Sequence, residues 1–230
     1  ETITKIYLRK AIKVESFTEL KENQTAQRFF TDLRAEYEVT KLAGERWNEY
    51  YFNKFGVDVR SLRYPGLVSW KAAPGGGTTD YAVDIFHQAI KTGKYESFLS
   101  KNTKLPMMYM SDAIRATIML MEAPFEQVNI RSSYNLSGIS FAPKDISAEI
   151  SKYIPSFEIS YNSDFRQKIA DSWPSSINDK HARNDWGWEL EYDLKKMTES
   201  MIIKKLNLFI NKFASNTGFL VGYFIVYVAN

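Results

Sequence analysis

Tyr37 and Lys41 form the residue pair of this sequence that is best suited to proton transfer. Residues four apart on a helix lie on one face, about one turn from each other. A neighbouring ammonium favours the phenolate form of a tyrosine and lowers its pKa from an ordinary value of about 10. Such a tyrosine can accept the hydroxyl proton of an alcohol as hydride leaves the adjacent carbon. The pair therefore predicts alcohol oxidation or the reverse reaction.

The same spacing also occurs in Tyr50/Lys54 and in Tyr192/Lys196. Spacing alone leaves two interpretations open for the first pair, a catalytic site or an ordinary surface pair on a helix.

A glycine cluster at residues 74–79 (PGGGTT) is the second candidate site. Backbone N–H groups ahead of a helix can bind a carboxylate or a phosphate, helped by the helix dipole. The alternative is a flexible loop in which Thr78 or Thr79 caps the next helix. No G-x-G-x-x-G occurs in the sequence, so the cluster is not a dinucleotide fingerprint.

Several classes of chemistry are excluded or disfavoured by composition. There is no cysteine, which rules out disulfides, thiolate metal ligands and a cysteine nucleophile. His87 and His181 lie far apart, so no metal site is predicted. The net charge is only +3 and the basic residues form no stripe, which argues against a nucleic-acid partner.

The apolar run at residues 218–229 (GFLVGYFIVYVA) is shorter than the roughly twenty residues that a membrane-spanning helix needs. We expect a buried or stray terminal segment, with membrane contact as the less favoured alternative.

The elements that must position these residues alternate between helices and strands. Apolar residues recur three to four apart from Val39 to Tyr51, which predicts a long helix carrying the Tyr37/Lys41 pair and ending at Gly56. Strands are predicted at 57–64, 105–110, 134–136 and 157–161, and further helices at 79–92, 111–122, 143–153, 179–185 and 194–213. This order predicts an α/β protein with at least partly parallel strands.

Five stretches of the chain together resemble one known family. They are residues 41–70, 74–90 (PGGGTTDYAVDIFHQAI), 105–124, 165–174 (FRQKIADSWP) and 185–194 (DWGWELEYDL). The set is similar to the L-threonine 3-dehydrogenases of the extended short-chain dehydrogenases, which are related to the UDP-galactose epimerases.

The resemblance implies the C-terminal part of a Rossmann-like doubly wound fold, followed by a small mixed α/β substrate domain. It implies that NAD is the cofactor and L-threonine the substrate, with Tyr37 as proton donor and acceptor and Lys41 as the residue that tunes it and holds the nicotinamide ribose. The remaining implied site residues are Tyr64, Pro65, Gly66 and Leu67 around the nicotinamide, and Gly77, Thr78, Thr79 and Trp173 around the substrate. It also implies a homodimer formed through the tyrosine helix.

The two ends of the sequence depart from the family. The Gly-rich turn for the pyrophosphate, the acidic residue for the adenosine ribose and the Ser or Thr that assists the tyrosine should precede Tyr37. The preceding residues resemble none of them, and Glu38 stands where the family usually has glycine. We therefore expect a partial dehydrogenase at residues 37–202, without the N-terminal nucleotide-binding half, between unassigned segments at 1–36 and 203–230.

The function predicted from the sequence is NAD-dependent oxidation of L-threonine to 2-amino-3-oxobutanoate, in a truncated and poorly active form. The alternatives are a non-catalytic relic or interaction module, and a nucleotide-sugar epimerase or reductase of the same superfamily. No transit segment opens the chain, so a cytoplasmic location is predicted, with the mitochondrial matrix as the alternative.

Overall fold

The computed structural model describes the backbone of residues 6–10 and 36–217 and the side chains of residues 40–210. Its strands are β1 (Ile6–Lys10), β2 (Arg60–Tyr64), β3 (Gly66–Val68), β4 (Lys94–Ser97), β5 (Leu105–Tyr109), β6 (Tyr134–Asn135), β7 (Ile139–Phe141) and β8 (Glu158–Tyr161). Its helices are α3 (Glu36–Phe55), α4 (Tyr81–Thr92), α5 (Met110–Glu122), α6 (Pro143–Ser151), α7 (Phe165–Ala170), α8 (Lys180–Trp186) and α9 (Leu194–Thr217), with 3-10 turns η1 (Thr78–Asp80) and η2 (Phe125–Gln127).

The strands form three small sheets. The first has the order β1-β2-β6, and both of its pairings are parallel. In the second, β5 pairs in parallel with β3 and antiparallel with β7, and the third consists of the parallel pair β4-β8. The predicted α/β class with largely parallel pairing is confirmed.

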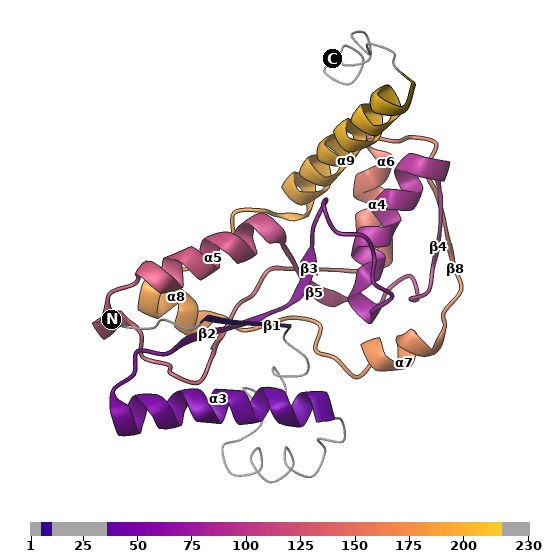
Figure 1. The fold of residues 1–230 in the computed structure, drawn as a ribbon. Coiled ribbons are helices and arrows are strands. Elements are labelled where there is room, and N and C mark those ends of the chain that lie inside the picture. The colour runs from indigo at the N-terminus through magenta and orange to yellow at the C-terminus, as the bar shows by residue number, and fades with distance from the viewer. Residues whose placement is uncertain (1–5, 11–35, 218–230) are drawn as a thin grey trace.

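Two hydrophobic cores lie on either side of β5. The first, the α4–α9 core, contains Tyr81, Phe86, Leu105, Met107, Tyr109, Phe141, Met197 and Met201 among its buried residues. The second, the α5–α8 core, contains Leu62, Tyr64, Met108, Ala116, Leu120, Tyr134, Trp186 and Trp188. Adjacent residues of a strand point to opposite faces, so Met107 and Met108 enter different cores. In Figure 1, α9 runs beside α4 and α6, whereas α5 and α8 lie over β2.

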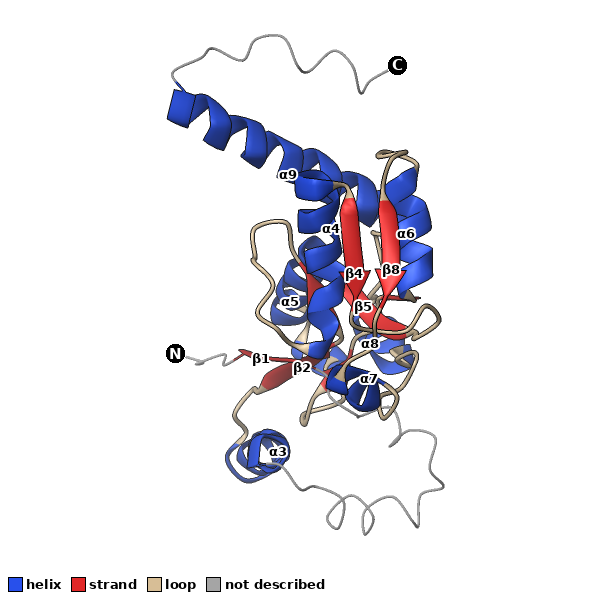
Figure 2. Cartoon of the chain, turned by 90° about the vertical axis from the view of Figure 1, so that its right-hand side faces the viewer, coloured by secondary structure: helices blue, strands red, loops and turns tan. Residues whose placement is uncertain are grey.

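The helix that carries Tyr37 and Lys41 stands apart from both cores. Figure 2 shows α3 end-on, at the opposite end of the molecule from α9. It ends at Gly56, whose φ of 66° is the left-handed conformation that glycine adopts without strain, as the sequence predicted. The strand predicted from Val57 begins only at Arg60, because residues 57–59 lead from the helix to the sheet without regular pairing.

Side chains rather than backbone packing hold α3 on the sheet. Glu45 accepts a hydrogen bond from Arg63 Nε of β2 at 3.0 Å, and Asn48 Nδ2 donates to the carbonyl of Ser132 at 3.2 Å. Near the C-terminal end of the helix, the guanidinium of Arg131 lies 4.3 Å from the ring centre of Phe52.

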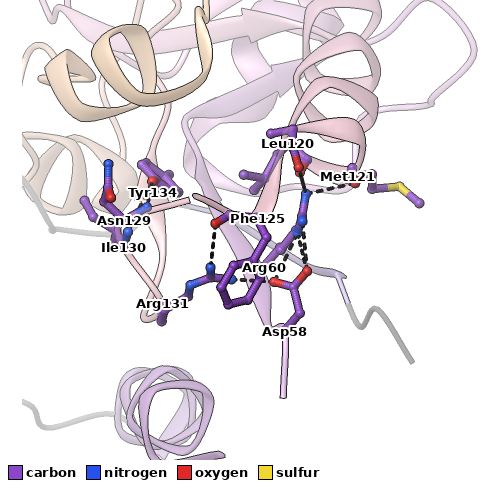
Figure 3. A network of polar contacts seen from close by, with 10 residues as sticks. Asp58, Arg60, Leu120, Met121, Phe125, Asn129, Ile130, Arg131 and Tyr134 are labelled. Atoms are coloured by element: carbon purple, nitrogen blue, oxygen red, sulfur yellow. Dashed lines mark hydrogen bonds and ion pairs between the residues drawn. The ribbon is translucent and has the colours of Figure 1, made fainter. Parts of the chain in front are cut away.

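Arg131 belongs to a polar network at the start of β2 (Figure 3), in which Asp58 accepts from both Arg131 and Arg60. Burial alone would raise the pKa of Asp58, but the two guanidinium groups outweigh it and the pKa is lowered. Arg60 Nη1 donates to the carbonyls of Leu120 and Ala123, both at 2.6 Å. The arginine thereby satisfies carbonyls at the C-terminal end of α5, which have no partner within the helix.

Within the part of the chain that the structure describes, no helix is long and apolar enough to cross a membrane. The apolar run at residues 218–229 lies outside that part, as do residues 1–5 and 11–35.

Candidate functional site

The backbone of α3 places Tyr37 in its first turn and Lys41 one turn later. The side chain of Tyr37 is outside the described residues, whereas Lys41 is partly buried. One further turn along the same face, Glu45 is buried against Arg63 of β2. The predicted pair therefore lies on a helix face that, one turn further on, is directed at the sheet, and the catalytic role of the pair stays a prediction.

The predicted nicotinamide residues lie where the chain passes from one sheet to another. β2 ends at Tyr64, β3 begins at Gly66, and only Pro65 separates them. Tyr64, Pro65 and Gly66 are buried, and Leu67 is partly buried against the α5–α8 core.

The side chain of Tyr64 points into the α5–α8 core, where its hydroxyl contacts Thr117 Oγ1 and donates to the carbonyl of Ala113 at 3.3 Å. Burial raises the pKa of Tyr64 to about 12, although the Thr117 contact lowers it. The Tyr64 hydroxyl is therefore bonded to residues of α5. Only the backbone of Tyr64 is available to a ligand at the junction between β2 and β3.

Gly66 brings the two predicted halves of the site together. A Cβ atom at this position would lie 2.5 Å from Met107 Sδ and 2.8 Å from Thr79 Cγ2. Such separations are too short for real Cβ contacts, so only glycine fits between β5 and the threonine turn. The structure thus places a predicted nicotinamide residue directly against a predicted substrate residue.

The glycine cluster is organised by Asp80, which the sequence interpretation overlooked. Its carboxylate accepts hydrogen bonds from the N–H groups of Gly75 at 2.8 Å and Gly77 at 2.7 Å. These two N–H groups are therefore already bonded within the chain and are not free for a carboxylate or phosphate, as one interpretation of the cluster required. An acidic residue three positions after Gly77 was the available sequence signal.

The prediction that Thr78 or Thr79 caps the next helix is wrong. Both threonines form the 3-10 turn η1, and Asp80 is the N-cap residue of α4. The threonine side chains are instead buried, with exposed fractions of 8% and 5%.

Trp173 lies just beyond α7, a short helix that contacts the glycine cluster. Its backbone N–H donates to the carbonyl of Ala170 at 3.0 Å, and its partly buried ring packs against the α4–α9 core. Arg166 of α7 lies over the ring of Phe98 at 3.3 Å and donates to the carbonyl of Gly76 at 3.4 Å. The region around Trp173 is therefore tied to the predicted substrate residues through Arg166.

Among the described side chains, no three His, Asp or Glu residues gather closely enough to hold a metal ion.

Comparison with known proteins assigns the class. Residues 14–137, more than half of the chain, match the NAD dependent epimerase/dehydratase family. The chain belongs to this family.

Within the family, the chain is similar to L-threonine dehydrogenases. It is 56% identical to the apo form of a GalE-like L-threonine dehydrogenase from Cupriavidus necator, with a TM-score of 0.71 over 73% of this chain and 61% of that one. It is 52% identical to the L-threonine dehydrogenase from Phytophthora infestans, with a TM-score of 0.72 over 75% and 55% of the two chains. The resemblance suggested by the sequence motifs is confirmed.

Curated relatives include the mitochondrial L-threonine 3-dehydrogenase of Bos taurus, 48% identical over 74% of this chain and 45% of the relative. An uncharacterized epimerase/dehydratase of Staphylococcus haemolyticus is 52% identical over 72% and 52%. The chain thus spans about half the length of the curated relatives it matches. A UDP-glucuronic acid 4-epimerase from Bacillus cereus, 17% identical with a TM-score of 0.64, shares the fold.

Proposed function

We propose that the protein oxidises L-threonine at its 3-hydroxyl, with NAD as the hydride acceptor, to give 2-amino-3-oxobutanoate. The observation that carries the proposal is the similarity to L-threonine dehydrogenases over about three quarters of this chain. The B. cereus epimerase is far less similar in sequence, so it gives no comparable support to a nucleotide-sugar reaction.

In this proposal, Lys41, one turn further along α3, favours the phenolate form of Tyr37, which then accepts the proton of the substrate hydroxyl. NAD supplies the hydride acceptor when it is bound. Lys41 also holds the nicotinamide ribose, and the backbone from Tyr64 to Leu67 supports the nicotinamide ring. The partly buried Lys41 and the buried Pro65–Gly66 backbone at the β2–β3 junction are compatible with that end of the cofactor.

The substrate is proposed to lie against Gly77, Thr78 and Thr79, with Trp173 closing over it. The contact between Gly66 and Thr79 supports this arrangement. It brings the turn carrying Thr78 and Thr79 next to the β2–β3 junction, which is proposed to contact the nicotinamide. Since the N–H groups of Gly75 and Gly77 are bonded to Asp80, we expect the threonine hydroxyls and the Gly76 region to supply the polar contacts.

The 230-residue chain by itself is expected to bind NAD weakly. Its sequence contains no G-x-G-x-x-G to seat the pyrophosphate. Each missing charge-assisted contact would remove about 1.5–3 kcal/mol of binding free energy. Titration with NAD, followed by tryptophan fluorescence, should therefore show no saturation in the micromolar range. Micromolar binding that is lost in the Tyr37→Phe/Lys41→Ala double variant would contradict this expectation and strengthen the assignment of the pair.

A chimera tests the chemistry separately from cofactor affinity. Residues 37–202 would replace the matching segment of the C. necator enzyme, which supplies the rest of its own fold. We expect threonine-dependent NADH formation, and a fall of about a hundredfold to ten-thousandfold on Tyr37→Phe. Tyr50→Phe is the matched control, because Tyr50/Lys54 has the same spacing in α3. A chimera that binds NAD but leaves threonine unoxidised would reject the proposed function.

We also propose that the protein forms a homodimer through α3. Four aromatic residues on this helix are exposed between 41% and 59%, and they contact one another: Trp47, Tyr50, Tyr51 and Phe55. Exposed apolar patches of this kind are typical of interfaces. One relative, 53% identical, is described as a monomeric L-threonine 3-dehydrogenase. Sedimentation of the parent chain and of Tyr51→Glu distinguishes the two states, since only a dimer formed here would dissociate in the variant.

We propose residues 37–202 as the bounds of the partial dehydrogenase domain. α9 continues past residue 202 without a break, and Leu206 packs against the α4–α9 core. The cytoplasmic location also stays a prediction, and relatives such as the bovine enzyme are named mitochondrial.

A further inference from the structure

A buried lysine of α9 makes contacts that the proposed reaction does not use. Lys205 is only 5% exposed. Its Nζ atom donates to the carbonyl of Trp70 at 3.1 Å and lies 2.6 Å from Nε2 of His87 on α4. None of the ion pairs between described residues includes Lys205. Burying an ammonium without a carboxylate partner costs free energy. The contacts with Trp70 and His87 offset part of that cost.

His87 faces two groups with one ring nitrogen. Its Nε2 atom lies 2.6 Å from Lys205 Nζ and 3.2 Å from the carbonyl oxygen of Ala72. A neutral imidazole nitrogen either accepts from the ammonium or carries a proton that it donates to the carbonyl, but it cannot do both. The two contacts therefore exclude each other, and the position of one proton decides which of them is a hydrogen bond.

Both carbonyls belong to residues 69–77, the segment that leads from β3 into the threonine turn. Lys71 and the residues from Ala72 to Gly77 are exposed, so packing does little to hold this stretch. Lys205 contacts it from α9 and His87 contacts it from α4. At its far end, Asp80 binds the N–H groups of Gly75 and Gly77. Within the segment, Lys71 N–H donates to Ser69 Oγ, and Arg166 donates to the Gly76 carbonyl, so Lys205 and His87 supply the contacts to Trp70 and Ala72 between these points.

Burial favours proton loss from both groups. Burial lowers the pKa of Lys205 to about 8. Burial also lowers the pKa of His87, and Lys205 lowers it further, whereas Asp84 on the same helix and the Ala72 carbonyl raise it. The ammonium groups of Lys71 and Lys204 lie 5.2 Å and 5.7 Å from the ring centre of Trp70, and neither is a counter-ion for Lys205.

We propose that Lys205 and His87 form a proton-controlled clamp that fixes residues 69–77 and positions the turn carrying Thr78 and Thr79. In the closed state, the Lys205 ammonium donates to the Trp70 carbonyl and to neutral His87. When Lys205 loses its proton to solvent, its remaining N–H groups are uncharged and donate more weakly, and His87 can release its Nδ1 hydrogen to solvent, take one up on Nε2 and donate to Ala72 instead. When His87 gains a second proton, the two cations repel each other and the lysine contact breaks. The clamp follows from these contacts alone, and only its bearing on threonine binding rests on the proposed function.

The two histidines of the chain make the clamp measurable by NMR. His181 on α8 is exposed and serves as an internal reference for His87. In the parent chain, the His87 ring should titrate below the ordinary histidine range, because burial lowers its pKa. In Lys205→Met, the His87 midpoint should rise by about one pH unit or more, because the neighbouring positive charge is gone. Lys205→Arg keeps the charge and should keep the midpoint low, and Lys195→Met, an exposed lysine of α9, should change neither ring.

Trypsin cleavage after Lys71 measures how firmly residues 69–77 are held, because this bond lies within the segment. Cleavage there, relative to cleavage after the exposed Lys101, should be about fivefold to tenfold faster in Lys205→Met, since one charged hydrogen bond is lost. Lys205→Arg should restore slow cleavage. In the parent, the relative rate should rise as pH increases through about 8, where Lys205 loses its proton. In Lys205→Arg it should not.

The proposal is overturned if the His87 midpoint is the same in the parent and in Lys205→Met, or if the arginine variant is cleaved as fast as the methionine variant. These measurements need no cofactor or substrate. A failure of threonine oxidation in the chimera would therefore leave their outcome unaffected.

Discussion

The threonine turn and helix α3 both carry predicted site residues, but the structure holds them in different ways. Thr78 and Thr79 are buried between β3, β5 and α4, and Gly66 has no room for a Cβ atom beside them. The described contacts of α3 include the Glu45–Arg63 ion pair with β2 and the contacts of Asn48 and Phe52 with the loop before β6, while Trp47, Tyr50, Tyr51 and Phe55 are exposed. The threonine turn is part of a packed interior, whereas α3 is attached to the rest of the molecule by a few side-chain contacts.

Substitutions in the two regions should therefore disrupt the proposed site in two distinct ways. A fault in the packed region should unfold the whole domain, because its residues are shared with the α4–α9 core. A fault in the attachment of α3 should move the helix and leave the core intact, since local openings follow regions with few buried contacts.

The largest effect is expected at Gly138, in the packed region. A Cβ atom there would lie 2.0 Å from the carbonyl oxygen of Met107, which is backbone and cannot rotate away. Gly138→Ala should lower the free energy of unfolding by about 3 kcal/mol or more, measured by urea denaturation. Gly75→Ala is the control, because its Cβ would meet only Asp80 Oδ2 at 3.4 Å. Equal stability of the two variants would mean that β5 and β7 are not packed as described.

A smaller and local effect is expected at Glu45. Replacing it with alanine leaves Arg63 without its carboxylate partner, although Asn135 Oδ1 still accepts from Nη1 at 3.0 Å. We expect a loss of about 2 kcal/mol, below the value for a fully buried pair because the Arg63 side chain is 19% exposed. Hydrogen exchange should accelerate in α3 and not in α4.

Glu49→Ala provides the control for this helix. Its partner Arg46 is 65% exposed, so the pair should contribute less than about 1 kcal/mol. Uniform acceleration of exchange in Glu45→Ala, in α4 as well as in α3, would remove the distinction between packed and attached regions.

The smallest effect is expected at Tyr64, between the two regions. Tyr64→Phe removes the contact with Thr117 and the hydrogen bond to Ala113, which should cost about 1 kcal/mol of unfolding free energy. Because only the backbone of Tyr64 faces the junction between β2 and β3, the rate of threonine oxidation by the chimera should be unchanged. A hundredfold loss of activity with normal stability would show that the hydroxyl reaches the cofactor after all.

The elements that the sequence predicted well are those whose signals are local. The apolar spacing of α3 and its glycine end, and the buried strand β5 followed by α5, agree with the structure. The short strands β4 and β7 escaped prediction, because each is completed by partners elsewhere in the chain. Lys94–Ser97 becomes a strand by pairing with Glu158–Tyr161. The helix predicted from residue 111 begins one residue earlier, at Met110.

The candidate site divides along the same line. The motif around Pro65 and Gly66 and the threonine pair were identified from resemblance, and the structure brings Gly66 and Thr79 into contact. The Lys205–His87 contact joins residues 118 positions apart and follows no spacing rule. The role of Asp80 as a ligand of Gly75 and Gly77 likewise depends on how the loop folds back. Such tertiary contacts leave no periodic trace in a single sequence.

The junction at Pro65 determines how the two sheets can move. Pro65 alone joins the end of β2 to the start of β3, and its ring fixes its φ at about −65°. Relative rotation at this junction is therefore confined to few torsions, and bulk on the Gly66 side is excluded by Met107 and Thr79. The close packing of Met107 and Thr79 on Gly66 therefore keeps the start of β3 next to η1, and thermal motion should twist the two sheets about this junction without separating β3 from η1.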